Sequence, residues 1–275
     1  MEFGQSMMPS MLLKPKSNKI VLSFFELISL KIQRINSRLA FVVIGPLVHY
    51  LVFKRFRITI ENLMAIRRQY KAILKEATGP ILVCPNHLTL VDSIIQAVAL
   101  NSLAGHFFHF RSLPWNLPEK KNFYHKILWR LLCYLGKSIP VVRGASPVEG
   151  KKSVEKMHYL LKCGEIISIF PEGKRSRSGF VDDVDYSYAV GHLLKEFPET
   201  NVLCLYMRGI KSGGFSNFPM EGENFYFELK LIKPESKENG LKKVRDLSKQ
   251  VITELKAMEN NYLLKGSHAN EAVGW

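Results

Sequence analysis

The sequence predicts an α/β protein with a single mixed, largely parallel sheet that is flanked by helices and preceded by an N-terminal, membrane-associated helical hairpin. Three observations support this prediction. Beyond residue 56, short apolar runs alternate with longer amphipathic segments, as in strand–helix–strand units. The chain has 275 residues, of which 47% are hydrophobic, and this is enough for one large core. Two apolar stretches with basic residues at their ends precede this region.

The N-terminal region is expected to form two parts. Residues 1–19 are polar and lack periodicity, so we expect a mobile leader without the features of a signal peptide. Residues 20–30 and 39–53 are apolar, but each is shorter than the roughly 18 residues that a membrane-spanning helix needs. The segment between them is basic, which suits the anionic lipid of a cytoplasmic leaflet. Residues 20–55 therefore predict a helix pair lying in the membrane surface, with two ordinary core helices as the alternative.

One domain is expected from residue 56 to 265, followed by a tail at 266–275. Strands are expected where apolar residues alternate with polar ones or run continuously between turns, and helices where the apolar period is close to 3.6. Gly79-Pro80, Gly136 and Gly164 end three of the helices. The expected strands are 56–60, 81–84, 106–110, 138–142, 165–170, 201–206 and 224–232. The expected helices are 61–77, 90–100, 123–135, 151–163, 186–197 and 241–264.

The net charge of +15 is unevenly distributed along the chain. Residues 1–180 carry the whole excess of Lys and Arg, and residues 181–275 are nearly neutral. Such a field favours phosphates, whether in nucleic acid, anionic lipid or a phosphorylated substrate. No helix-turn-helix, zinc finger or aromatic RNA motif is present, so nucleic acid is not an expected partner. The four cysteines are scattered in apolar surroundings without a CxxC pair, which predicts reduced core residues and neither disulfides nor a zinc site.

A histidine and an aspartate follow the second expected strand. His87 lies on the turn and Asp92 lies in the first turns of the next helix. Residues five apart point about 140° from each other on a regular helix, so the pair can meet only if His87 precedes the helix. Asp92 could then orient the imidazole, which would act as a general base. Thr89 and Ser93 are possible nucleophiles, but no G-x-S-x-G motif surrounds them. The alternative is a purely structural role for both residues.

Basic and acidic side chains follow two other expected strands. Arg143 ends one strand, and residues 172–177 follow another. Because the carboxyl ends of parallel strands share one edge, these residues should meet His87 in one crevice. Arg143 and Arg175 would supply the forked contacts that phosphate prefers. No metal site is expected, and His106 and His109 are assigned to the core because no acidic partner lies near them.

Three segments carry a family resemblance. Residues 86–92 (Asn-His-Leu-Thr-Leu-Val-Asp), 136–144 (Gly-Lys-Ser-Ile-Pro-Val-Val-Arg-Gly) and 170–176 (Phe-Pro-Glu-Gly-Lys-Arg-Ser) resemble, in this order and spacing, the main blocks of the glycerolipid acyltransferases. This is the family of lysophosphatidic acid (1-acyl-sn-glycerol-3-phosphate) acyltransferases. The match covers about residues 56–209, and residues 20–53 are similar to the membrane-lying helix pair of bacterial members.

The resemblance implies roles for individual residues. His87 would be the general base and Asp92 its partner, while Arg143 and Arg175 would bind the phosphate of the acceptor. Glu172 and Gly173 would shape the acceptor site.

Three departures concern the acceptor. Lys174 stands where the family often has Thr and adds charge to the substrate-binding block. Cys204 stands where an apolar strand of the family usually has Pro, and residues 181–185 are unusually acidic.

The expected function is transfer of a fatty acyl group from acyl-CoA or acyl-carrier protein to the hydroxyl of a lysophospholipid, converting lysophosphatidic acid to phosphatidic acid. The protein would act on the cytoplasmic face of a membrane, as a peripheral or monotopic enzyme, with membrane lipid and the acyl donor as partners and no further cofactor. Backbone N–H groups near the His87 turn are the expected oxyanion donors. A lyso-aminolipid acceptor is the second hypothesis, motivated by the acidic residues 181–185. A non-catalytic, basic membrane-binding protein is the third.

Overall fold

The computed structural model describes residues 22–142, 147–211 and 216–271. Its centre is a six-stranded sheet in the order β1-β6-β5-β2-β4-β3. Neighbouring strands are parallel except β5 and β6, which are antiparallel, so the predicted mixed, largely parallel sheet is confirmed. The strands are β1 (Thr59–Ile60), β2 (Ile81–Pro85), β3 (Trp115–Asn116), β4 (Ile167–Ser168), β5 (Asn201–Gly209) and β6 (Asn224–Ile232).

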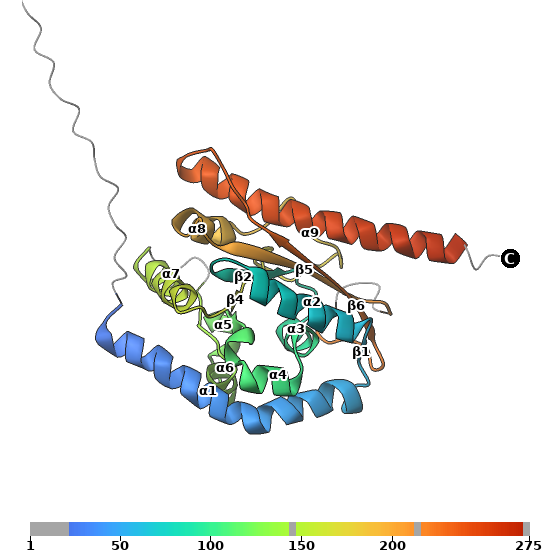
Figure 1. The fold of residues 1–275 in the computed structure, drawn as a ribbon, viewed down its shortest axis with the longest axis horizontal. Coiled ribbons are helices and arrows are strands. Elements are labelled where there is room, and N and C mark those ends of the chain that lie inside the picture. Colours follow the sequence, from blue (N-terminus) through green and yellow to red (C-terminus); the bar gives the residue numbers. More distant parts are fainter. Residues whose placement is uncertain (1–21, 143–146, 212–215, 272–275) are drawn as a thin grey trace, which may run out of the picture.

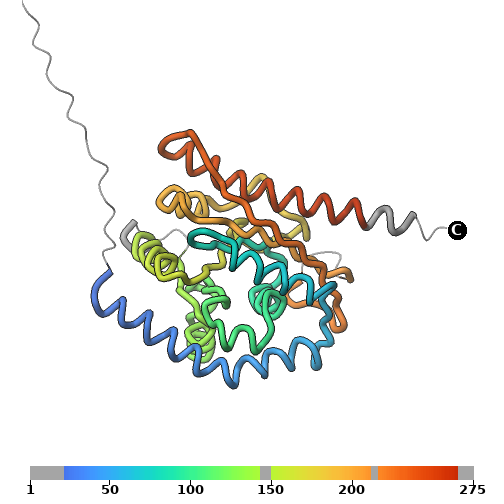
Figure 2. Tube along the Cα trace, viewed as in Figure 1, coloured from blue at the N-terminus to red at the C-terminus, as the bar shows by residue number. Residues whose placement is uncertain are grey.

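Helices cover the sheet on both faces, with α1 along one side of the molecule and α9 along the opposite side (Figures 1 and 2). The longer helices are α1 (Phe24–Tyr50), α2 (Leu63–Glu76), α3 (Asp92–Leu100), α6 (Ile127–Leu135), α7 (Pro147–Lys162), α8 (Ala189–Glu196) and α9 (Gly240–Glu271). The short ones are η1 (Leu51–Arg55, a π-helix), α4 (Leu103–Phe108), η2 (Phe110–Ser112, a 3₁₀ helix) and α5 (Lys120–Phe123).

The alternation of side chains along β2 divides the core into two parts. Leu82 and Cys84 belong to a cluster that includes residues of α7, α8 and α9. Ile81 and Val83 belong to a second cluster with residues of α2, α3 and β6. Every residue of β2 is buried because helices cover both of its faces, as expected for a parallel strand in the middle of an α/β sheet.

The predicted N-terminal hairpin is wrong, because one continuous helix replaces it. Helix α1 passes through the basic segment and continues directly into η1. The polar residues that suggested a connection face the domain instead. The Gln33 side chain donates to the carbonyl oxygens of Tyr134 and Ser138 at 3.1 and 2.9 Å, and the Ser37 hydroxyl donates to Tyr134 at 3.1 Å. The predicted leader, residues 1–19, lies outside the described residues, and α9 extends into the predicted tail.

The strand predicted at residues 106–110 is also wrong, since most of it belongs to helix α4 and the 3₁₀ turn after it. Ser102 caps α4 by accepting the N–H of Gly105 at 2.9 Å. His106 is a buried core residue, as predicted, but His109 is exposed. Residues 138–142 form only isolated bridges to residues 116 and 119 rather than a regular strand. The predicted helix 123–135 begins later, as α6, after a separate short α5.

Candidate active site

The turn that carries His87 is fixed to the middle of the sheet by the residue before it. Asn86 directly follows β2 and is 1% exposed. Its amide nitrogen donates to the carbonyl of Met207 at 3.0 Å, and its amide oxygen accepts the N–H of Met207 at 2.8 Å. This pair of bonds continues the β2–β5 pairing through a side chain. The chain therefore leaves β2 at a defined point and enters α3 at Asp92.

Asp92 is buried, and its carboxylate organises the turn. Oδ2 contacts Nδ1 of His87 at 2.9 Å and accepts the N–H groups of Leu88 and Thr89 at 2.6 and 2.8 Å. Oδ1 accepts the hydroxyl of Thr89 at 2.5 Å. These bonds compensate the burial of the charge and hold Nδ1 of His87 in the protonated form. Within the described residues Nε2 has no hydrogen-bond partner, so it can accept a proton.

Thr89 and His87 differ in how far their polar side-chain atoms are engaged. The hydroxyl of Thr89 is committed to Asp92, which removes this residue as a nucleophile. The imidazole stacks on the ring of Phe170, with centroids 4.0 Å apart and planes 22° apart, and is 19% exposed. Phe170 follows β4, so the ring that supports the imidazole comes from the third sequence block. The sequence predicted that these two blocks converge, and the stacking shows how.

Glu172 and Ser176 tie the third block to the backbone of His87. Oε1 of Glu172 accepts the N–H of His87 at 2.8 Å, and the carbonyl of His87 accepts the N–H of Ser176 at 2.8 Å. Glu172 is 2% exposed. Burial raises its pKa to about 8, although the N–H groups of His87 and Asp182 partly offset this effect. Burial therefore favours the neutral form of this carboxyl, which positions the His87 turn by accepting its N–H.

Gly173 fits only as glycine. Its φ of +69° is one that side chains disfavour, and a Cβ there would lie 2.7 Å from the Cβ of Ser187. The sharp turn after β4 brings the Glu172 carboxyl to the N–H of His87, and Lys174 and Arg175 follow directly after the turn. The role in shaping the acceptor site remains a prediction for both Glu172 and Gly173.

The cations predicted to line the crevice differ in their partners. Lys174 forms ion pairs with Asp182 at 3.0 Å and Asp185 at 2.5 Å, so the acidic segment compensates its charge. Arg175 is half-buried and donates to the side-chain oxygen of Asn217 at 2.6 Å. Arg143 lies outside the described residues, so its convergence with His87 is untested.

The N–H groups of the turn are all occupied. His87 donates to Glu172, Leu88 and Thr89 donate to Asp92, and Leu90 donates to the carbonyl of Asn217 at 3.0 Å. The expectation that this turn supplies the oxyanion donors is therefore not met in this structure.

The sequence matches the family model of the acyltransferases over residues 57–215. The chain belongs to this acyltransferase family. The matched range is more than half of the chain, and it contains the His87 turn, Asp92 and the block from Phe170 to Ser176. A comparison with curated proteins finds no significant match. Acyl transfer is thus the general activity of the protein, and the substrates remain to be proposed.

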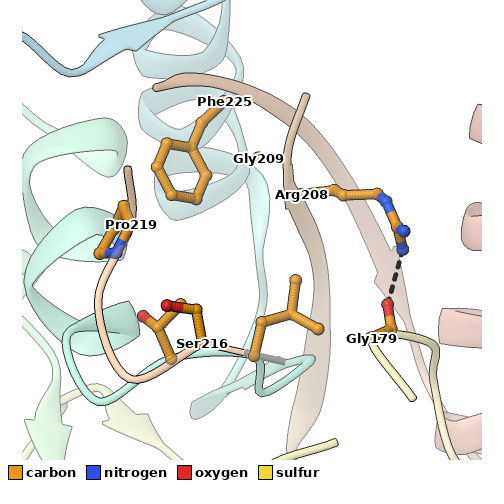
Figure 3. Close-up of a pocket in the computed structure, with 8 residues that line it drawn as sticks. Gly179, Arg208, Gly209, Ser216, Pro219 and Phe225 are labelled. Atoms are coloured by element: carbon orange, nitrogen blue, oxygen red, sulfur yellow. Dashed lines mark hydrogen bonds between the residues drawn. The ribbon is translucent and has the colours of Figure 1, made fainter. Parts of the chain in front are cut away.

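The acyltransferase has one buried arginine beside the turn that the sequence did not reveal as important. Arg208, at the end of β5, donates to the carbonyl of Gly179 at 2.6 Å (Figure 3). Its guanidinium also lies over the ring of Phe180, 4.9 Å from the centroid. The hollow that it borders has about 10 Å³ of space, on the order of one water molecule, so it is no substrate cavity in this conformation. Leu88, Thr89, Gly179, Arg208, Gly209, Ser216, Pro219 and Phe225 line it.

Asn86 and Phe170 lie in the blocks that the sequence singled out, but their contacts, like those of Arg208, were not predicted because each partner is distant in sequence. Cys204, the departure from the family pattern, is buried in β5 opposite Cys84 and belongs to the core. In the part of the chain that the structure describes, no group of three His, Cys, Asp or Glu residues could hold a metal ion.

Proposed function

We propose that this acyltransferase moves a fatty acyl group from an acyl thioester, acyl-CoA or acyl-carrier protein, to the hydroxyl of a lysophospholipid, and that lysophosphatidic acid is the acceptor. The observation that carries the proposal is the His87–Asp92 pair, in which Asp92 orients Nδ1 and Nε2 is free to take a proton. A base without a protein nucleophile suits direct transfer between two bound substrates.

The reaction needs one base. Nε2 of His87 removes the proton of the acceptor hydroxyl as the oxygen attacks the thioester carbonyl carbon. Asp92 stabilises the imidazolium that forms, through its contact with Nδ1 at 2.9 Å. When the tetrahedral intermediate collapses, the carbon–sulfur bond breaks and the leaving thiolate takes the proton from Nε2. The products are an ester and a free thiol, and His87 returns to its neutral form.

Phosphate is favoured over an ammonium group as the charge on the acceptor. The acidic segment 181–185 was the reason to consider a lyso-aminolipid, but Lys174 engages two of its three carboxylates, Asp182 and Asp185. Arg175 lies on the segment that leads away from Glu172, and Arg143 is the second proposed phosphate ligand by family resemblance. We therefore assign the acceptor phosphate to these two arginines.

Helix α1 supports binding to a membrane surface. Among the described residues, one helix, Phe24–Arg55, is long and apolar enough to cross a membrane. It nevertheless lies along the domain beside α4 and α6, with polar residues such as Gln33 bonded to the domain (Figure 1). Its opposite side exposes Phe25, Leu39 and Val43, at 82, 67 and 72%. We propose that α1 lies in the plane of the cytoplasmic leaflet, where its Lys and Arg residues meet anionic lipid.

Helix α6 extends this apolar surface. Its exposed apolar residues are Ile127, Leu128, Trp129, Leu131 and Leu132. Isolated apolar residues are common on protein surfaces, but a helix in which five such residues are exposed beside α1 is unusual for a water-facing surface. We assign α1 and α6 together to the membrane-binding face.

The catalytic proposal is tested by release of free thiol from acyl-CoA and acyl-carrier protein with a panel of lyso-acceptors. His87→Ala should lower kcat with lysophosphatidic acid by about 100- to 10,000-fold, while leaving the melting temperature and vesicle binding unchanged. His192→Ala, a histidine of α8, is the control and should retain activity. Full activity of His87→Ala would disprove the mechanism. Activity with a lyso-aminolipid alone would show that the acceptor is not a lysophospholipid.

The membrane proposal is tested with vesicles of phosphatidylglycerol and phosphatidylcholine. Ile127→Ser/Trp129→Ser should weaken vesicle binding by on the order of tenfold or more, because two large apolar side chains no longer enter the lipid. Leu241→Ser/Leu263→Ser is the matched control, since α9 lies on the opposite side of the molecule from α1 (Figure 1). Equal effects of the two double variants would refute this binding face.

A further inference from the structure

A basic groove lies at the opposite edge of the sheet from His87. It has about 330 Å³ of space and is bounded by α1, α7 and the segment before β4. Glu165 precedes β4, whereas His87 follows β2, and the two strands are parallel neighbours. The groove is therefore separate from the acyl-transfer site. Leu30, Lys31, Arg34, Arg111, Tyr159, Leu160, Cys163 and Glu165 line it.

Three cations surround a single buried carboxylate at the base of the groove. Glu165 is 1% exposed. Its Oε2 accepts Nζ of Lys137 at 2.8 Å and Nε1 of Trp115 at 2.8 Å. Its Oε1 lies 2.9 Å from Nε of Arg34 and 3.8 Å from Nε of Arg111. One negative charge is thus shared by three positive ones.

Lys137 alone can neutralise Glu165, which leaves the arginines in excess. Lys137 is fully buried, and burial lowers its pKa to about 8, while Glu165 acts in the opposite direction and Arg34 and Arg111 lower the pKa further. The two arginines are 38 and 60% exposed at their side chains, and each guanidinium has five N–H donors. Within the described residues Lys31 has no acidic partner, so it adds a further positive charge to the wall.

We propose that this groove binds a phosphate-bearing anion, held by Arg34, Arg111 and Lys31. Guanidinium groups bind phosphate with paired hydrogen bonds, and the apolar wall of Leu30 and Leu160 would accept carbon atoms attached to it. The volume lies within the range of small-molecule sites. The ligand can be the headgroup of an anionic phospholipid or a soluble phosphate. This inference does not depend on the proposed acyl-transfer reaction.

Cys163 offers a direct readout, because it lines the groove and is half-buried. Its alkylation by iodoacetamide, an uncharged reagent, is followed by mass spectrometry on the full-length protein. Inorganic phosphate at ten times its dissociation constant should slow alkylation about tenfold. Potassium chloride at equal ionic strength should not. Cys133, on α6 and outside the groove, is the internal reference and should react at an unchanged rate.

Charge variants distinguish phosphate binding in the groove from a nonspecific effect of the positive charge of the protein. Lys31→Gln/Arg111→Gln should raise the phosphate concentration needed for protection by about tenfold or more, because two charge-assisted contacts are lost. Arg34 is left in place because it joins α1 to Glu165. Arg38→Gln/Lys54→Gln is the matched control, since it removes equal charge from exposed positions of α1 and η1 outside the groove. In each variant the rate with phosphate is compared with the rate without it.

Vesicles distinguish the two sources of phosphate. Protection by phosphatidylglycerol vesicles but not by phosphatidylcholine vesicles, lost in Lys31→Gln/Arg111→Gln alone, supports a lipid headgroup. Protection by inorganic phosphate alone supports a soluble ligand. The proposal is overturned if neither probe protects Cys163, or if both double variants respond equally. None of these readouts measures acyl transfer, so failure here leaves the acyltransferase assignment untouched.

Discussion

Two buried carboxylates, at opposite edges of the same sheet, are stabilised in different ways. Asp92 and Glu165 are each 1% exposed. Asp92 is held by backbone N–H groups, one hydroxyl and the Nδ1 of His87. Glu165 is held by Lys137, Arg34 and the indole of Trp115. One charge is thus compensated by dipoles, and the other by full positive charges.

The two ways of compensating a buried charge suit different roles, one in catalysis and one in stability. Because dipoles satisfy Asp92 without neutralising it, its charge remains to act on the imidazole of His87. Because cations neutralise Glu165, it has no charge left for a substrate and instead joins α1, η2 and the second sequence block. Substitution of the first should therefore affect activity most, and substitution of the second should affect stability most.

The largest expected effect is on activity at Asp92. In Asp92→Asn the amide oxygen would keep the Oδ2 position, because Leu88 and Thr89 also donate there, but the negative charge that stabilises the imidazolium would be lost, so kcat should fall by about 1,000-fold. Steady-state thiol release measures this, and circular dichroism checks that α3 still forms. Asp183→Asn, at an exposed acid near the site, should change kcat little. Activity within a few-fold of the original would show that Asp92 does not orient the base.

Next in size is the loss of stability at Glu165. Glu165→Gln leaves Lys137 and two arginines without their carboxylate, which should lower the free energy of unfolding by about 3 kcal/mol. Urea unfolding measures it. The control Glu221→Gln breaks contacts of 4.0 Å at exposed residues and should cost about 0.5 kcal/mol or less. At temperatures where Glu165→Gln is folded, its kcat should be nearly normal. A large fall in kcat with unchanged stability would show that Glu165 serves the reaction and not the stability of the fold.

The smallest expected effect is a pH dependence of stability caused by Glu172, a third buried carboxyl. Its pKa is raised to about 8, above that of the unfolded chain, so between these values the folded protein binds one more proton. Stability then falls as pH rises, by about 1 kcal/mol per pH unit between pH 5.5 and 7.5. Glu172→Gln should lack this slope in urea titrations at several pH values. Parallel slopes for both proteins would mean that Glu172 ionises normally.

The elements that the sequence predicted correctly depend on local patterns. Strand β6 was predicted at its observed bounds, residues 224–232, because its apolar residues alternate and one face is buried. The contact between His87 and Asp92 was also predictable, because a strand end, a short turn and a helix start leave few ways to place these two side chains. The fold class follows from the same alternation of strands and helices.

Predictions failed where a distant partner decided the structure. The basic, polar segment between the two apolar stretches resembled a connection, but carbonyl groups of Tyr134 and Ser138 satisfy Gln33 and so allow one helix. Gly45 also lets Leu103 of α4 approach, since a Cβ there would lie 2.7 Å from it. The short apolar run 106–110 fits a strand or a helix by its period, and the cap at Ser102 determined the helix.

The sequence by itself determined the acyltransferase blocks, the His87–Asp92 pair and the α/β architecture, because all three depend on the spacing of residues that are close in sequence. Only the tertiary structure decided how the blocks are joined: Glu172 reaches the N–H of His87, Phe170 supports the imidazole, and Lys137 meets Glu165. Burial is the physical reason for the division. A buried polar group needs a partner at hydrogen-bond distance, and the folded chain supplies that partner from residues far away in sequence.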